Sequence, residues 1–167
     1  GAAPDIPGYD LRGLIVGSEG TLGIVTRVLV RLTENPPNVV TMLISFEDIT
    51  DAARTVSEII SSGLVPAALE MMDGPMIEAV ENFVHAGLPV GAGAVLLAEV
   101  VGHPDGIATE AELIREIARN NNANEIRTAS DEDERALLWK GRKSAFGAVA
   151  QAAPDYYLND TVVPRTR

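Results

Sequence analysis

From residue 38 onward the sequence alternates between two hydrophobic periods, and this alternation limits the folds that the chain can adopt. Strand-like runs rich in Val, Ile and Leu are expected at residues 39–46, 65–71, 94–101 and 125–128. Helix-like stripes follow them at residues 48–61, 75–83, 107–118 and 130–150. Strands and helices in turn predict either an α+β fold of ferredoxin-like type or a doubly wound parallel sheet.

We favour the α+β interpretation, with a mixed or antiparallel sheet and the helices on one side, although periodicity alone leaves the parallel sheet open. Residues 94–101 are almost wholly apolar, so this strand is expected to be buried. Residues 130–133 resemble a capping box that opens one long helix reaching about residue 150. A last extended segment is expected at residues 156–163.

Pro36 and Pro37 interrupt regular structure and mark a connector. The part before them contains a short apolar run at residues 14–16, a glycine-rich loop at residues 17–23 and a strand-like run at residues 24–32. So few residues cannot build a hydrophobic core by themselves. Residues 1–35 are therefore expected to belong to a domain whose main part lies elsewhere.

Composition excludes several classes of function. The formal net charge of −11 repels phosphate backbones, so no nucleic acid is expected as a partner. The sequence has no cysteine, which excludes disulfides, thiolate metal sites and cysteine nucleophiles. No apolar run approaches the roughly 20 residues of a membrane span, and the first residues lack the features of a signal peptide. A cytoplasmic protein is the expectation.

Arg142 is the first candidate for chemistry. In one continuous helix it would share an apolar stripe with Leu138, Ala145 and Val149. An arginine on such a stripe needs an anionic partner, because burying it unpaired is costly. Two alternatives remain: an internal Glu or Asp, which the residues alone favour, or the carboxylate of a substrate held bidentately.

Other polar residues have simpler interpretations. Glu70 is expected to be a strand residue with a polar partner, and Asp73 the N-cap of the next helix. Glu99 lies in the apolar strand, where it either pairs with a buried cation such as Arg142 or lines a site. His85 and His103 stand alone in loop-like settings, so no metal site is expected.

The glycine-rich loop at residues 17–23 is a weak signal by spacing alone. Its glycines permit positive φ and a close approach of backbone to a ligand. It matches neither the P-loop nor the dinucleotide-binding fingerprint. A tight connection between strands is the favoured interpretation at this level.

Five segments, taken in order, resemble the FAD-linked oxidases of the vanillyl-alcohol oxidase and p-cresol methylhydroxylase type, nearest to glycolate oxidase and D-lactate dehydrogenase. They are residues 10–26 (DLRGLIVGSEGTLGIVT), 66–73 (PAALEMMD), 98–102 (AEVVG), 138–143 (LWKGRK) and 159–165 (NDTVVPR). Residues 73–91 match least. The resemblance implies that residues 1–35 are the C-terminal edge of the FAD-binding domain. Residues 38–167 would form the cap, or substrate, domain, incomplete at its C-terminus.

The same resemblance implies a function and its residues. A 2-hydroxy acid, glycolate or D-lactate, would be oxidised by hydride transfer to FAD, with Arg142 binding the substrate carboxylate. The resemblance also implies that FAD is contacted, mainly through backbone groups, by Glu19, Gly20, Gly23, Ile24 and Val25. Relatives place a lysine shortly before the aspartate that matches Asp160, and this chain does not, so substrate specificity is not carried over.

The resemblance also implies what this internal part of an enzyme would lack. Complete members have a pyrophosphate-binding loop upstream and a histidine-containing segment downstream, where the catalytic base lies. We therefore expect the isolated chain to be inactive and not to retain FAD. Partner subunits of an oxidase complex and a homo-oligomer fit the same family. The alternative function is a stand-alone acidic α+β module for regulation or interaction, without flavin.

Overall fold

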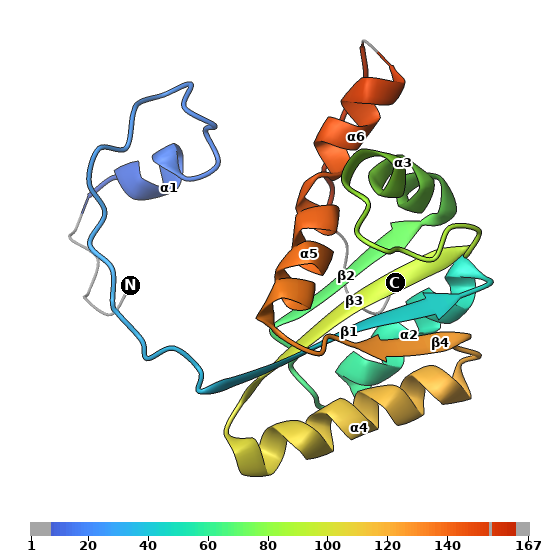
Figure 1. The fold of residues 1–167 in the computed structure, drawn as a ribbon. Coiled ribbons are helices and arrows are strands. Elements are labelled where there is room, and N and C mark those ends of the chain that lie inside the picture. Colours follow the sequence, from blue (N-terminus) through green and yellow to red (C-terminus); the bar gives the residue numbers. More distant parts are fainter. Residues whose placement is uncertain (1–7, 154, 163–167) are drawn as a thin grey trace. The chain divides into compact units, whose positions relative to one another are not determined.

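The computed structural model describes residues 8–153 and 155–162, as drawn in Figure 1. The chain divides into two compact units, Gly1–Asn35 and Pro36–Arg167. The division falls immediately before Pro36 and Pro37, where regular structure was expected to stop.

The larger unit is built on a four-stranded sheet with the order β2-β3-β1-β4 (Figure 1). Every neighbouring pair is antiparallel. This is the strand order of a ferredoxin-like fold, so the α+β prediction is confirmed and the parallel sheet is excluded. The strands are β1 (Asn38–Phe46), β2 (Ala68–Asp73), β3 (Ala94–Gly102) and β4 (Glu125–Thr128).

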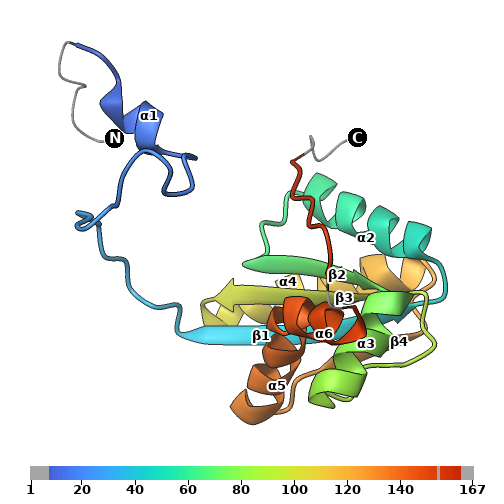
Figure 2. The same ribbon diagram turned by 90° about the horizontal axis from the view of Figure 1, so that it is seen from above.

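Helices cover both faces of this sheet (Figure 2). One face carries α2 (Ile49–Ser61) and α4 (Pro104–Asn120). The other carries α3 (Gly74–Val84), α5 (Glu132–Lys143) and α6 (Ala145–Ala152). The expectation of helices on one side therefore holds for α2 and α4 only. The physical reason is that β3 is apolar on both faces, so each face has to be covered.

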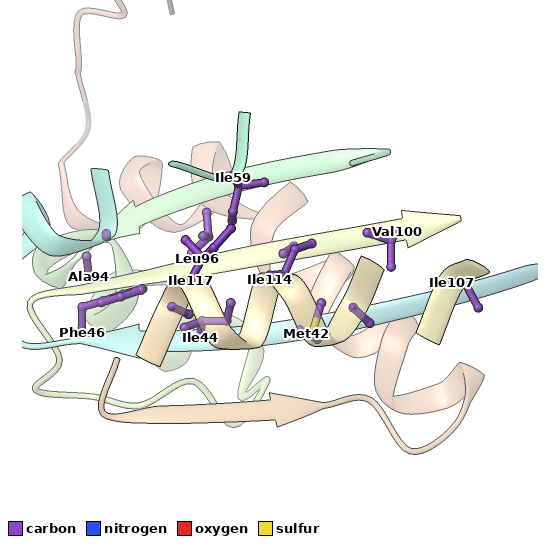
Figure 3. Packing of buried hydrophobic residues seen from close by; sticks show 14 residues of the cluster. Met42, Ile44, Phe46, Ile59, Ala94, Leu96, Val100, Ile107, Ile114 and Ile117 are labelled. Atoms are coloured by element: carbon purple, nitrogen blue, oxygen red, sulfur yellow. The ribbon is translucent and has the colours of Figure 1, made fainter. Parts of the chain in front are cut away.

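The two cores follow the alternation of side chains along the central strands. Met42, Ile44 and Leu96 point toward α2 and α4, where Ile59 and Ile114 complete a layer without solvent contact (Figure 3). The neighbouring positions point the other way and meet α3, α5 and α6. That second layer contains Leu43, Val95, Leu97, Ile77, Val80 and Leu138.

The long helix expected from residue 130 is two helices, α5 and α6, which meet at Ser144. Both contact the region of α3 through glycines. A Cβ at Gly141 would lie 3.1 Å from the Cβ of Ala86, and one at Gly147 would lie 3.0 Å from the ring of Phe83. The change of direction lets two short helices pack around α3, which helical periodicity alone does not reveal.

The smaller unit has little regular structure among residues 8–35. The run at residues 14–16 contributes to a single short helix, α1 (Leu11–Ile15), and residues 24–32 are extended without forming a strand. The strand prediction for residues 24–32 is therefore wrong for this structure. A strand needs a neighbour for its backbone groups, and none lies within the described part of this unit. Leu29 is 100% exposed.

Two expectations concern the end of the chain and membranes. Residues 156–162 are described and form no strand, while Val163 of the expected segment lies outside the described residues. Among the described residues, no helix combines the length and apolarity that crossing a bilayer requires.

Candidate functional site

Arg142 of α5 makes an ion pair with Glu70 of β2. Its Nε donates a hydrogen bond of 2.8 Å to the Glu70 Oε2 atom, and its Nη2 lies 2.7 Å from the same oxygen. The Arg142 and Glu70 side chains remain 38% and 35% exposed. The structure thus contains the internal partner that the residues alone favoured, and it confirms that Glu70 is a strand residue with a polar partner.

A cavity of about 290 Å³ lies beside this pair. Among the described residues that line it, Arg142 is the one charged side chain, and the others are mainly apolar and aromatic. A small anion with an apolar part matches such a lining, because the guanidinium can pair with the anion while the rest excludes water. The other lining residues are Met71, Met72, Met76, Ala145, Phe146, Val149, Tyr156, Tyr157 and Leu158.

Glu99 is the centre of a separate polar cluster between β3, β1 and α5. Its Oε2 accepts hydrogen bonds from the Thr41 hydroxyl at 2.6 Å and the Trp139 indole at 2.7 Å. The Arg135 guanidinium donates to both carboxylate oxygens, at 2.9 and 3.1 Å. Pairing with a cation, the first interpretation left open for Glu99, is confirmed, and Glu99 also lines a hollow together with Trp139 and Lys143. Its partner is Arg135, however, and Glu99 is not part of the lining of the Arg142 cavity.

The environment of Glu99 shifts its protonation. Burial by itself raises the pKa of this carboxyl, but hydrogen bonds from Arg135, Thr41 and Trp139, with the charge of Arg135, outweigh burial and lower the pKa below its ordinary value. The same pair raises the pKa of Arg135, mainly through the hydrogen bond to Glu99. Glu99 is therefore held as a carboxylate at neutral pH.

This shift predicts how stability depends on pH. Because the folded-state pKa of Glu99 is below its unfolded value near 4.5, its stabilising contribution is complete above that value. The contribution is lost as the pH falls from there through the folded pKa. We expect urea unfolding between pH 7 and pH 3 to show a steeper loss of free energy for the wild type than for Glu99→Gln. Equal slopes would contradict this assignment. Using the difference between the two proteins removes the shared effects of Asp48, Glu112 and Glu134, whose pKa values are also lowered.

Two predicted helix starts are capped by aspartates. Asp73 caps α3, since its carboxylate accepts from the Met76 backbone N–H at 3.0 Å. Asp131 caps α5 by accepting from the Glu134 N–H at 2.8 Å, while the Glu134 carboxylate accepts from the Ser130 N–H. His85 and His103 are exposed, and no group of His, Asp or Glu in the described residues is arranged to hold a metal.

The glycine-rich loop of the smaller unit is exposed and tightly turned. Gly17, Glu19 and Gly20 have positive φ values of 81°, 49° and 79°. A hydrogen bond of 2.9 Å from the Thr21 N–H to the Ser18 carbonyl closes the turn. Of the residues implied as FAD contacts, Glu19 and Gly20 lie in this turn. Gly23, Ile24 and Val25 lie at its exit, and all five are exposed. A backbone presented in this way is open to contact by a ligand or another domain.

A family model described as FAD linked oxidases, C-terminal domain, matches residues 35–167. The chain belongs to this family. The flavin-linked interpretation is thereby supported over that of an unrelated acidic module. The matched residues make up the larger unit, which contains both Arg142 and the Glu99 cluster.

Curated relatives of this FAD-linked oxidase chain include glycolate oxidase subunits and D-lactate dehydrogenases. It is 44% identical over 163 residues to the glycolate oxidase subunit GlcD of Escherichia coli K12, covering 98% of this chain and 33% of that protein. GlcD of Bacillus subtilis is 42% identical over 164 residues, covering 98% and 35%. A probable mitochondrial D-lactate dehydrogenase of Danio rerio is 33% identical over 162 residues, covering 96% and 32%. The chain thus spans about a third of the length of these relatives.

Solved structures support the fold of this FAD-linked oxidase domain. An alkyldihydroxyacetonephosphate synthase aligns with a TM-score of 0.61 over 89% of this chain and 30% of that chain. The sequence identity is 16%, so this likeness concerns the fold alone.

Sequence reasoning missed some of the contacts around Glu99 and Arg142. Arg135 and Trp139 were not connected with Glu99, although their spacing of four residues puts them on one helix face. Tyr156 and Tyr157 line the Arg142 cavity from beyond α6, and nothing local in the sequence indicates that contact.

Proposed function

We propose that this chain is part of a longer FAD-dependent enzyme that oxidises a 2-hydroxy acid, glycolate or D-lactate, to the 2-oxo acid. The observation that carries the proposal is Arg142, a half-exposed guanidinium at the edge of a small apolar cavity. The names of the relatives, glycolate oxidase subunit and D-lactate dehydrogenase, supply the substrate class. A 2-hydroxy acid has the carboxylate that an arginine of this kind can bind.

Arg142 can bind a substrate carboxylate without releasing Glu70. Glu70 occupies the Nε and Nη2 side of the guanidinium. No hydrogen bond from Nη1 to another described residue is present, so the end formed by Nη1 and Nη2 has donors left for a second carboxylate. A guanidinium has five donors in a fixed plane, which suits two carboxylates at two edges. Glu70 would then hold the plane still while the substrate binds at the other edge.

The size of the cavity supports a small substrate. Its volume of about 290 Å³ is at the lower end of the usual range of roughly 300–1,000 Å³ for ligand pockets. Glycolate and D-lactate are small enough to enter it. The side chains of Met72, Met76 and Phe146 would contact the non-polar part and exclude water.

Residues 1–35 are proposed to be the C-terminal edge of the FAD-binding domain, and residues 38–167 the cap domain. Glu19, Gly20, Gly23, Ile24 and Val25 are the proposed FAD contacts. Their exposed backbone fits one side of a cofactor site, because a Cβ at Gly20 would meet nothing within 4 Å. When bound, FAD would accept the hydride from the substrate carbon.

The residues of this chain would bind and orient the substrate. Arg142 would fix the carboxylate, which sets the position of the adjacent C–H and O–H groups. Neither His85 nor His103 lines the cavity, so the base that takes the hydroxyl proton is proposed to come from another part of the enzyme. A subunit partner is proposed because the relative GlcD is a glycolate oxidase subunit, and a cytoplasmic location remains part of the proposal.

Flavin spectroscopy tests the proposal. We expect the full-length enzyme, loaded with FAD and kept without oxygen, to lose its visible flavin absorbance on addition of glycolate or D-lactate. The chain of residues 1–167 alone is expected to lose FAD on desalting. If neither acid bleaches the flavin of the full-length enzyme, the proposed substrate class is wrong. If residues 1–167 retain FAD stoichiometrically, the share of the cofactor site assigned to the rest of the enzyme is wrong.

A further inference from the structure

One face of α5 carries three donors that meet two carboxylates on the sheet. Arg135, Trp139 and Arg142 are spaced four and three residues apart, so they lie along the same side of the helix. Arg135 and Trp139 donate to Glu99 of β3, and Arg142 donates to Glu70 of β2. Side-chain hydrogen bonds therefore join α5 to the neighbouring strands β3 and β2 at two points.

Glu70 and Glu99 project from the same face of the sheet. In the antiparallel pairing of β2 with β3, Ala68 lies opposite Glu99 and Glu70 lies opposite Leu97. Glu70 is two residues from Ala68, so the two carboxylates are diagonal neighbours on one face. Glu99 meets the first half of α5 at Arg135, and Glu70 meets its last turn at Arg142.

The Glu99 end of this arrangement is the more firmly built. Glu99 is 7% exposed and accepts hydrogen bonds from three different side chains. A buried carboxylate is costly unless its oxygens are satisfied, so Glu99 strongly favours the one position of α5 that supplies Arg135 and Trp139. The bond from Thr41 ties the same carboxylate to β1.

Apolar packing holds α5 less firmly. Its only buried residues are Leu138 and Gly141, whereas α4 on the opposite face has five. Because hydrophobic burial scales with contact area, a helix with few buried residues depends more on its polar contacts. Polar contacts therefore help to set the rotation and register of α5, together with the packing of Leu138 and Gly141.

We propose that Glu99, acting through Arg135 and Trp139, is a positioning residue for Arg142. It fixes the rotation and register of α5, so that the Arg142 guanidinium meets Glu70 on one edge and faces the cavity with the other. The consequence for substrate binding rests on the function proposed above. The consequence for the position of Arg142 does not.

Loss of the contact between Arg135 and Glu99 would affect Arg142 indirectly, through the position of α5. Arg135 is two turns from Arg142, so it cannot touch a molecule bound there except through the helix. A small rotation of α5 would lengthen the bond from Arg142 to Glu70 and turn the guanidinium away from the cavity. Misplacement of a binding group by about 1 Å can cost a large part of its effect.

The variant that tests this inference is Arg135→Gln, with Lys140→Gln as its matched control. Both remove one positive charge from α5, but Lys140 is exposed and makes no ion pair with a described residue. Two spectroscopic measurements on the chain of residues 1–167 follow the position of the helix. Trp139 is the single tryptophan, so its fluorescence reports the Glu99 cluster directly. The NMR signal of the Arg142 Nε–H group, identified by its loss in Arg142→Gln, reports the bond to Glu70.

We expect Arg135→Gln to change both the Trp139 emission and the Arg142 Nε–H signal, and Lys140→Gln to change neither. An unchanged Nε–H signal in folded Arg135→Gln would overturn the inference, whatever the enzyme does. If Arg135→Gln does not fold, Thr41→Val, which removes only one bond to Glu99, gives the same two measurements with smaller changes.

Kinetics of the full-length enzyme separate this inference from the proposed function. Arg135→Gln should raise the KM for glycolate or D-lactate about tenfold and leave kcat within a factor of about two, because the substrate is bound less well but reacts similarly once bound. A normal KM in Arg135→Gln, with a raised KM in Arg142→Gln, would refute only the effect of this positioning on substrate binding. The proposed role of Arg142 would stand. A normal KM in Arg142→Gln itself would refute the proposed role of Arg142 and leave the NMR result to decide the positioning of the side chain.

Discussion

Replacing Arg142 by Gln in the full-length enzyme is expected to raise the KM for glycolate or D-lactate by about ten- to a hundredfold. A hydrogen bond to a charged group contributes roughly 1.5–3 kcal/mol, and each 1.4 kcal/mol corresponds to about a factor of ten. No second cation among the described residues lines the cavity beside Arg142. The loss should therefore appear as weaker binding, measured by steady-state kinetics with each acid.

Arg142→Lys is the informative companion to this substitution. Lysine keeps the charge but not the planar fork, so it cannot serve Glu70 and a substrate carboxylate at two edges together. We expect a KM between those of the wild type and Arg142→Gln. Lys140→Gln is the control for loss of charge on the same helix. An unaltered KM in a well-folded Arg142→Gln enzyme would remove Arg142 from substrate binding.

Gly93→Ala is expected to destabilise the chain by about 3 kcal/mol, because the site has no room for a methyl group and backbone must move. A Cβ at Gly93 would overlap the Glu47 carbonyl group. Gly93 also donates to the Phe46 carbonyl at 2.9 Å and accepts from the Gly74 N–H at 3.0 Å. It therefore joins the ends of β1 and β3 to the start of α3, and relaxation at this position would disturb all three.

Gly106→Ala is the matched control for this prediction. Gly106 lies in the first turn of α4, and a Cβ there would meet nothing within 4 Å. Alanine should be neutral or stabilise the chain by up to about 0.5–1 kcal/mol through helix propensity. Urea unfolding of both variants at one pH measures the difference. A Gly93→Ala protein as stable as Gly106→Ala would show that the close approach is not required.

Local patterns were sufficient for most of the elements. Strand-like runs of residues located β1, β3 and β4 within one or two residues, since β1 and β3 are mostly apolar and are buried on both faces. The helix cap at Asp73 was also readable, and the capping box expected at residues 130–133 was found one residue later, at Asp131 and Glu134, because capping depends on residues only three apart.

Patterns that depend on distant neighbours were not readable. Residues 24–32 have strand composition, but a strand exists only where a partner supplies hydrogen bonds. The division of one expected helix into α5 and α6 depends on close contacts with α3 and the loop after it, which involve residues some sixty positions earlier in the chain. The partner of Glu99 was assigned to Arg142 as an example, whereas the structure pairs it with Arg135.

The sequence by itself determined the alternation of strands and helices, the buried central strand and, through five ordered motifs, the family. It also singled out Arg142 and Glu99 as unusual, because a charge among apolar residues needs a partner. Only the tertiary structure decided that helices cover both faces of the sheet and which charge meets which. Each helix face and each strand face can be read from a local period, but the register between α5 and the β2–β3 pair is set by packing and hydrogen bonds between residues far apart in the chain. For that reason the sequence named Arg142 as a candidate, and only the fold put it between Glu70 and a largely apolar cavity.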